Sequence, residues 1–432
     1  MTVQDDVDRL IDERPGKELL VPRYDDPAKR LSDVILRSGG TTASYLLLAG
    51  TAGRVIVNCG LGYEAPHHKR VFDAVCPGPT PYIITTQAHV DHVGGVALFR
   101  EPTTRYVAQA DNLACQRDDE RIARFRMRTA GVWFDMTGAD AIRIAKENPG
   151  VVSRQDKPVP DIKFSERLSL KVGGLPIECI SVPGGETIDS TIIWLPEQRT
   201  ALISNILGPL FPHFPNFNTL RGDRYRWVEP YLQSVLTLRD LHPAMLVTGR
   251  HEPIVGEELI EASLTRLHDA VDFVHTETVA GINAGKDPDR LMREIALPPH
   301  LRVGQGYGKV AWAVRTIWET YIGWFKLRST TELYPSVADE AFTELVALSG
   351  ADAVIQRGRE LVDRGEPAAA IHLGEAVLRH DPDAGSATHL AAAALMAEAH
   401  QRLLDTGGVS NFWESGWLEA QRDRWQQVSV GS

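Results

Sequence analysis

One short stretch of the chain gathers side chains that could do chemistry. An apolar run ending at Ile84 is followed by the residues Gln87-Ala88-His89-Val90-Asp91-His92-Val93-Gly94-Gly95. Two imidazoles and a carboxylate within four residues are ligand types that suit Zn, Fe or Mn. The Gly-Gly pair lets the backbone pass close to such a site before the next helix. The spacing therefore predicts a metal site in the loop that follows a buried strand.

The strand before this loop belongs to a longer α/β pattern. Short runs rich in Val, Ile, Leu and Thr, bounded by turn residues, predict strands over 44–48, 54–58, 82–86, 104–108, 176–182, 191–195, 200–204 and 245–248. Helical patterns over 65–75 and 226–240 lie between some of them. The polar segment 111–161 fits this pattern poorly and predicts an insertion or a lid. We assign the α/β domain to residues 1–261.

After about residue 261 the strand signals nearly vanish. Apolar residues recur at spacings of three and four over 262–285, 310–325, 336–348, 351–364, 367–379 and 386–406, which predicts helices. We assign a helical domain to residues 262–432.

Composition excludes some classes of function. The 432 residues include 46 Lys and Arg against 57 Asp and Glu, a formal charge of −11. A general nucleic-acid binder or a polybasic membrane-surface protein needs the opposite balance. No apolar run reaches the ~20 residues of a membrane helix, and we see no secretory signal at the acidic N-terminus. The four cysteines lack any CxxC spacing, so we expect reduced thiols and a cytoplasmic location.

The loop resembles the His-x-His-x-Asp-His pattern of the metallo-β-lactamase superfamily. Three further stretches are similar to its alkylsulfatase-like branch: Val182-Pro183-Gly184-Gly185-Glu186, Asn216-Phe217-Asn218-Thr219-Leu220-Arg221-Gly222, and the segment 307–325. The resemblance runs from about residue 44 to about residue 417. It implies an αββα sandwich followed by an all-α dimerisation domain, and hence a homodimer. We expect the branch's sterol-carrier-like third domain to be missing.

The same resemblance implies a set of metal ligands. The first metal position would fall to His89 and Glu186 with Gln87, and the second to Asp91, His92 and a later histidine. We assign that histidine to His251. Alkylsulfatases place it one residue earlier, where Arg250 stands, but only the histidine can bind metal. Asn205 matches the position of a bridging acidic residue.

Two departures from the family pattern weaken the first position. Gln87 replaces a histidine and Asn205 replaces a carboxylate, and amide oxygens are weak neutral ligands. We therefore expect one firmly bound Zn, at Asp91, His92 and His251, and a second ion that is weak or absent. Fe and Mn remain alternatives.

The family's sulfate-gripping pair matches Asn216 and Arg221. A guanidinium can hold an anion with two parallel bonds, so a small anionic substrate is expected here. Nearby Phe211, Phe214 and Phe217 are equally compatible with an apolar tunnel and with core packing. His213 is interpreted as a surface residue, with a position facing the site as the alternative. The adjacent His67–His68 pair is interpreted as surface residues.

These residues predict a metal-dependent hydrolase that resembles alkylsulfatases. Water activated by the metal would attack a sulfate ester, with Asp91 or Glu186 relaying a proton. Two alternatives stay open. One is another reaction on the same fold: hydrolysis of a lactone, thioester or phosphoester, or an iron-dependent oxidation. The other is a metal-binding dimer without turnover.

Overall fold

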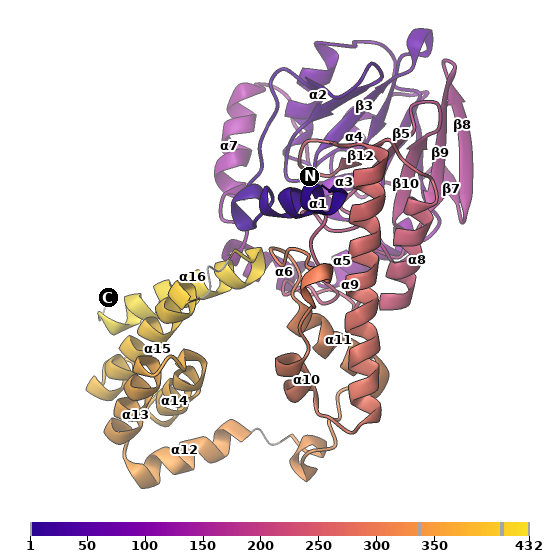
Figure 1. The fold of residues 1–432 in the computed structure, drawn as a ribbon. Coiled ribbons are helices and arrows are strands. Elements are labelled where there is room, and N and C mark those ends of the chain that lie inside the picture. Colours follow the sequence, from indigo (N-terminus) through magenta and orange to yellow (C-terminus); the bar gives the residue numbers. More distant parts are fainter. Residues whose placement is uncertain (1, 336–337, 407–409, 431–432) are drawn as a thin grey trace. The chain divides into compact units, whose positions relative to one another are not determined.

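The computed structural model describes residues 2–335, 338–406 and 410–430, and it divides into two compact units, 1–321 and 322–432. The first unit contains two β-sheets (Figure 1). One has seven strands in the order β1-β2-β3-β4-β5-β6-β7, and the other has six in the order β13-β12-β11-β10-β9-β8.

The seven-stranded sheet is antiparallel from β1 to β4 and parallel from β4 to β7. Its first strands are β1 (Lys29–Arg30), β2 (Ile35–Ser38), β3 (Ser44–Leu48) and β4 (Arg54–Val57), which pair antiparallel. The strands β5 (Tyr82–Ile84), β6 (Arg105–Gln109) and β7 (Ile162–Phe164) continue parallel to β4. The carboxyl ends of β4 to β7 therefore meet at one edge, where loops can converge.

The six-stranded sheet is mostly a meander. The strands β8 (Arg167–Val172), β9 (Leu175–Ser181), β10 (Thr191–Leu195) and β11 (Thr200–Ser204) pair antiparallel. β12 (Met245–Thr248) then joins β11 in parallel, and β13 (Ile254–Val255) closes the edge antiparallel to β12.

Alternation along the strands builds three apolar layers. Tyr45 and Leu47 of β3 point between the sheets, against residues such as Ile193 and Val247. Leu46 points the other way, into a layer with Val71 and Phe99. Because every second side chain of a strand faces the same side, each sheet buries both faces.

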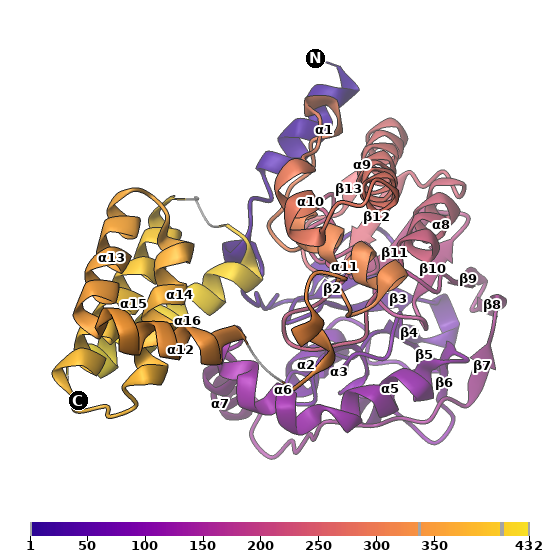
Figure 2. The ribbon, with the colours of Figure 1, turned by 90° about the horizontal axis from the view of Figure 1, so that it is seen from below.

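Helices cover the two outer faces, as seen in Figure 2. α2 (Ala65–Asp73) and α4 (Val96–Phe99) pack on the first sheet, next to the short α3 (Val90–Val93). α8 (Val228–Arg239), α9 (Glu257–Asn283) and α11 (Val310–Ile322) pack with the second sheet, and α1 (Val3–Asp12) and α10 (Pro288–Glu294) lie on that side. The predicted αββα sandwich is confirmed.

The predicted insertion 111–161 is largely helical. It contains α5 (Asn112–Arg121), α6 (Ala123–Thr129) and α7 (Thr137–Glu147). The predicted surface pair His67 and His68 is wrong: both are buried on α2, at 1% and 0% exposure, because that helix lies flat on the sheet.

The second unit is all-helical. It consists of α12 (Ala338–Ser349), α13 (Ala351–Asp363), α14 (Pro367–His380), α15 (Ala387–Thr406) and α16 (Phe412–Ser429). The predicted helix start at Ser336 lies outside the described residues. The compact units divide after Tyr321, whereas the boundary at 261/262 rests on the loss of strand signals and stays a prediction. Among the described residues no helix is long and apolar enough to cross a bilayer.

Candidate active site

The motif loop follows the central strand of the first sheet. β5 lies between β4 and β6, and the chain then turns into α3, with His89 as the residue before its first turn. Asn58 at the end of β4 fixes this loop, because its side-chain Oδ1 accepts the backbone N–H of Thr86 at 2.9 Å. The backbone carbonyl of His92 in turn accepts the N–H of Cys59 at 2.8 Å. The loop is thus held by the neighbouring strand, and its side chains converge on one place.

The side-chain amide of Gln87 lies at the centre of the cluster. Its Nε2 is 3.0 Å from His89 Nδ1, 2.8 Å from His92 Nε2 and 2.7 Å from Glu186 Oε2. An amide nitrogen carries two hydrogens, so it cannot serve three acceptors fully. Its partner atom Oε1 is buried without a hydrogen bond. Three lone pairs therefore converge where the amide group sits.

Asp91 and Asn205 meet through a threonine. Thr42 Oγ1 donates to Asp91 Oδ2 at 2.5 Å, and Asn205 Nδ2 donates to Thr42 Oγ1 at 3.0 Å. Burial raises the pKa of Asp91, but His92, His89 and the Thr42 hydrogen bond outweigh it, so the pKa lies below its ordinary value. Asp91 is held as a carboxylate beside His92, whose Nε2 is 3.8 Å from Asp91 Oδ2.

The predicted anion grip reaches the same cluster. Arg221 Nη2 lies 3.4 Å from His89 Nε2, and Asp223 Oδ2 lies 3.5 Å from the same nitrogen. Burial lowers the pKa of His89, but hydrogen bonds to Asp223 and Glu186 more than offset this and raise it. Asn216, which precedes Arg221 in the same loop, is buried. Its backbone carbonyl accepts a hydrogen bond from Arg226 Nη1 at 2.9 Å.

The sequence interpretation missed the charges that frame this grip. Arg226 Nη2 lies 3.5 Å from Glu186 Oε1 and 3.9 Å from Asp223 Oδ2. Arg126, from α6 of the insertion, lies 3.5 Å from Asp223 and donates to the carbonyl of Gly222 at 2.9 Å. The run Arg221-Gly222-Asp223, followed by Arg226, was the sequence signal that could have identified Asp223 and Arg226. The reach of Arg126 across the fold had no sequence signal.

The structure places His251 away from this cluster. Its Nε2 has no hydrogen-bond partner, and the charges acting on it are Arg14, Arg250, Arg23 and Arg37. Arg250 is the neighbour of the cluster instead, because Asp91 is the foremost charge acting on its guanidinium. Gly249, the residue before Arg250, is pressed against Asn205, where a Cβ would lie 2.2 Å from Oδ1. Asp91 is thus a neighbour of Arg250, whereas the charges acting on His251 are arginines.

The three phenylalanines are core residues. Phe211, Phe214 and Phe217 are each at most 1% exposed and pack in the layer under α8 and α11. Phe217 makes an edge contact with Tyr231, with ring centroids 5.4 Å apart. His213 is also buried, and its Nδ1 accepts the N–H of Gly306 at 2.9 Å, so its predicted surface position is wrong.

Known proteins share this arrangement of elements. The family model for alkyl sulfatase dimerisation matches residues 287–421. A linear primary-alkylsulfatase of Pseudomonas sp. (strain ATCC 19151) is 26% identical over 357 residues, covering 78% of this chain and 66% of that protein. An alkyl/aryl-sulfatase of Saccharomyces cerevisiae is 24% identical over 245 residues, covering 55% and 36%. The structure of the stereoselective inverting sec-alkylsulfatase Pisa1 from Pseudomonas sp. superposes with a TM-score of 0.77 at 17% identity, over 93% of this chain and 65% of that one.

The chain is alkylsulfatase-like: residues 287–421 match the dimerisation family, the sequence is similar to alkylsulfatases, and the fold is that of Pisa1. The predicted resemblance is thereby confirmed. This alkylsulfatase-like chain spans about two thirds of the length of the Pseudomonas relative.

The fold family implies divalent metal, and the donor set of the alkylsulfatase-like chain can be tested against it. As placed, no group of three or more His, Cys, Asp or Glu side chains among the described residues could hold a metal ion. The Gln87 amide lies between His89, His92 and Glu186. These three donors face one point, so they fit one ion once the amide rotates away.

A second ion does not fit. Its position would need the residue at 250, which is a guanidinium, and a bridging carboxylate, which is the neutral Asn205. A fixed positive charge beside Asp91 opposes a cation there. The donors that lie closest together in the alkylsulfatase-like chain are therefore His89, His92 and Glu186, and His251 is not among them.

Proposed function

We propose that this chain hydrolyses organic sulfate esters. One observation carries the proposal: the Arg221 guanidinium stands 3.4 Å from His89, so an anion gripped by Arg221 would face the motif loop. A planar guanidinium suits the oxygens of a sulfate group, and Asn216 is the second candidate for that grip. The substrate class is a small molecule with an anionic head.

The residues divide the work between holding and proton transfer. Asp223 and Glu186 flank His89 and fix its ring between them. Asp91, ionised at neutral pH, is the candidate to accept a proton from an attacking water, and Glu186 is the alternative. Arg221 offsets the charge that develops on the sulfate oxygens. A divalent ion held by His89, His92 and Glu186, with zinc proposed and iron or manganese as alternatives, would supply Lewis acidity and a more acidic water.

The test combines metal content with turnover. Protein purified without added metal is analysed by elemental mass spectrometry and assayed on decyl sulfate and 4-nitrophenyl sulfate for sulfate release. About one equivalent of zinc and sulfate release, both lost in His89→Ala, support the proposal. A loaded protein that leaves both esters intact but cleaves lactones, thioesters or phosphoesters overturns the sulfatase assignment. Iron with oxygen consumption does the same in favour of an oxidative reaction.

A metal-binding dimer without turnover is the second candidate. The observation in its favour is the Gln87 amide lodged among His89, His92 and Glu186, together with Arg250 in a ligand position. A protein that binds metal and inorganic sulfate but turns over no ester would establish this candidate.

The helical part of the chain is proposed to make a homodimer in a reducing, cytoplasmic compartment. The family model for alkyl sulfatase dimerisation supports the dimer, and four free thiols at Cys59, Cys76, Cys115 and Cys179 agree with the compartment. Light scattering of the full chain should give about twice the mass of 47.7 kDa. A monomer at micromolar concentration contradicts the proposed assembly.

A further inference from the structure

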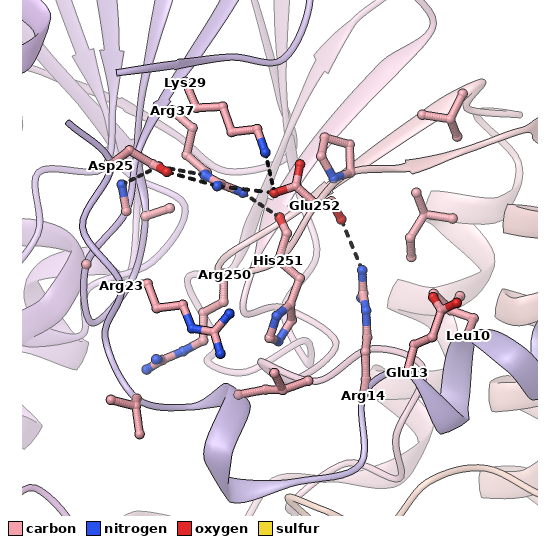
Figure 3. A pocket seen from close by; sticks show the side chains of 18 of the residues that line it. Leu10, Glu13, Arg14, Arg23, Asp25, Lys29, Arg37, Arg250, His251 and Glu252 are labelled. Atoms are coloured by element: carbon pink, nitrogen blue, oxygen red, sulfur yellow. Dashed lines mark hydrogen bonds and ion pairs between the residues drawn. The ribbon is translucent and has the colours of Figure 1, made fainter. Parts of the chain in front are cut away.

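A cavity lined in part by Arg250 and His251 lies beside the turn between β12 and β13. It has a volume of about 550 Å³, and Figure 3 shows its lining. The walls come from the N-terminal segment around α1, from β2 and the glycines after it, and from the turn between β12 and β13. Neither Arg221 nor Asn216 lines it, so it is separate from the predicted anion grip.

The cavity is cationic in a chain that is acidic. Its lining holds five cations, Arg14, Arg23, Lys29, Arg37 and Arg250, against three carboxylates, Glu13, Asp25 and Glu252. The whole chain carries a charge of −11. The positive excess is therefore local to this cavity.

Two of the three carboxylates are already engaged within the lining. Asp25 bonds Arg37 at 2.9 and 3.2 Å and also accepts the N–H of Gly39. Glu252 bonds Lys29 at 2.7 Å and lies 3.4 Å from Arg37. These two carboxylates pair with Arg37 and Lys29 and make no ion pair with the other cations of the lining.

Three arginines of the lining make no ion pair with a carboxylate among the described residues. Arg14 donates to the carbonyls of Phe211 and Glu252, and Arg250 donates to the carbonyl of Leu20 at 2.6 Å while its Nε has no partner. Arg23 is exposed and has no hydrogen bond or ion pair with any described residue. Carbonyl oxygens satisfy donors but do not cancel charge, so these guanidinium groups keep a positive field in the cavity.

The positive charges of this cavity act on His251. Its imidazole lies beside Arg23 and Arg250 in Figure 3, with its buried Nε2 unpartnered. Burial lowers its pKa to about 3, with further lowering by Arg14, Arg250, Arg23 and Arg37. A neutral imidazole next to two arginines can donate to an anion that the arginines attract.

The remaining walls are apolar. They are made by Leu10, Leu19, Val21, Ile254, Val255 and Leu259. A cavity of several hundred cubic ångströms with apolar walls and a few converging polar groups is typical of small-molecule sites. The lining of the cavity therefore has one charged region and one apolar region.

We propose that this cavity binds a small organic anion, with its anionic head on Arg23 and Arg250 and its apolar body against Leu19, Val21 and Leu259. A carboxylate or sulfate head on a short alkyl chain has this chemistry. Binding there requires no hydrolysis, so the proposal stands independently of the catalytic one.

Calorimetry on the full chain tests it with probes of matched length. Octanoate should bind saturably, whereas 1-octanol, which lacks the charge, octyltrimethylammonium, which reverses it, and acetate, which lacks the chain, should each bind at least about tenfold more weakly. Octyl sulfate tests whether the site distinguishes the two anionic heads, and binding by either anion supports the site. Equal binding of 1-octanol and octanoate overturns it.

Variants locate the site. Arg23→Gln removes an exposed, unpaired charge, so it should fold normally and weaken octanoate about tenfold, with Arg23→Lys in between. The matched control is Arg105→Gln, another exposed arginine, on β6, whose side chain has no hydrogen bond or ion pair among the described residues. It should bind octanoate as the unaltered protein does. Octanoate binding that survives Arg23→Gln but is lost in Arg221→Gln would place the ligand in the candidate active site and overturn the proposal.

Discussion

Replacing Arg221 by glutamine should remove the anion grip and leave the fold intact. Arg221 lies 3.4 Å from His89, and the carboxylate that shares this histidine, Asp223, keeps Arg126 at 3.5 Å and Arg226 at 3.9 Å after the change. No buried carboxylate is left without a cation, so we expect the substitution to weaken anion binding and to leave the free energy of unfolding nearly unchanged.

The magnitude follows from the bonds lost. A hydrogen bond to a charged group contributes about 1.5–3 kcal/mol, and about 1.4 kcal/mol corresponds to a factor of ten. Losing the guanidinium should therefore lower kcat/KM for a sulfate ester about 10- to 150-fold. Arg221→Lys keeps the charge but not the planar fork, and its kcat/KM should fall between the two.

The assay is the initial rate of 4-nitrophenyl sulfate hydrolysis, with the affinity for inorganic sulfate measured by calorimetry in parallel. The matched control is Arg224→Gln, three residues along the same loop, whose side chain is 77% exposed and lies 2.8 Å from Asp118. This control should behave as the unaltered protein does. A folded Arg221→Gln protein with unchanged kcat/KM and unchanged sulfate affinity would refute the assignment of Arg221 as the anion grip.

Three further predictions concern other parts of the molecule. Gln87→His replaces the intruding amide by a ligand, so metal content by elemental mass spectrometry should rise; unchanged content would show that the amide does not limit binding. Asp223→Asn removes the charge 3.5 Å from His89 Nε2, so kcat/KM should fall about 10- to 100-fold, and a value equal to the unaltered protein's would contradict the positioning role. His68 is buried and bonded to Ser38, and burial lowers its pKa to about 3, so it stays neutral in the fold while the unfolded chain binds a proton below pH 6.5. As the pH is lowered from 6.5 to 5, this group should therefore reduce the free energy of unfolding by about 2 kcal/mol. In denaturant titrations, His68→Gln should flatten this pH dependence. His300→Gln, at an exposed histidine, should leave it unchanged.

Several elements could be predicted because their signal is local. The strands over 44–48, 191–195, 200–204 and 245–248 have the predicted bounds, since continuous runs of Val, Ile, Leu and Thr fit a sheet buried on both faces. The interior strand β2, which is four residues long and includes Arg37, and the edge strands β1, β7, β8 and β13 were missed. They are short or carry exposed charged residues, and they are strands only because a neighbour pairs with them.

The same distinction applies to the site. The sequence determined that Gln87, His89, Asp91 and His92 would lie together, because a few residues after a buried strand cannot move far apart. It did not determine which of two adjacent residues, Arg250 or His251, would face them. That choice depends on the register of β12 and on the packing of Gly249 against Asn205, which are properties of the assembled sheet.

Long-range charge and burial were likewise decided only by the tertiary structure. Arg126 reaches Asp223 across 97 positions of the chain, and His251 acquires its field from Arg14, Arg23 and Arg37, which lie more than 200 residues away. The sequence by itself determined the chemistry available and the two-sheet core that carries it. The tertiary structure decided which charges meet, because electrostatic interactions act through space and are set by the packing of segments that are distant in the chain.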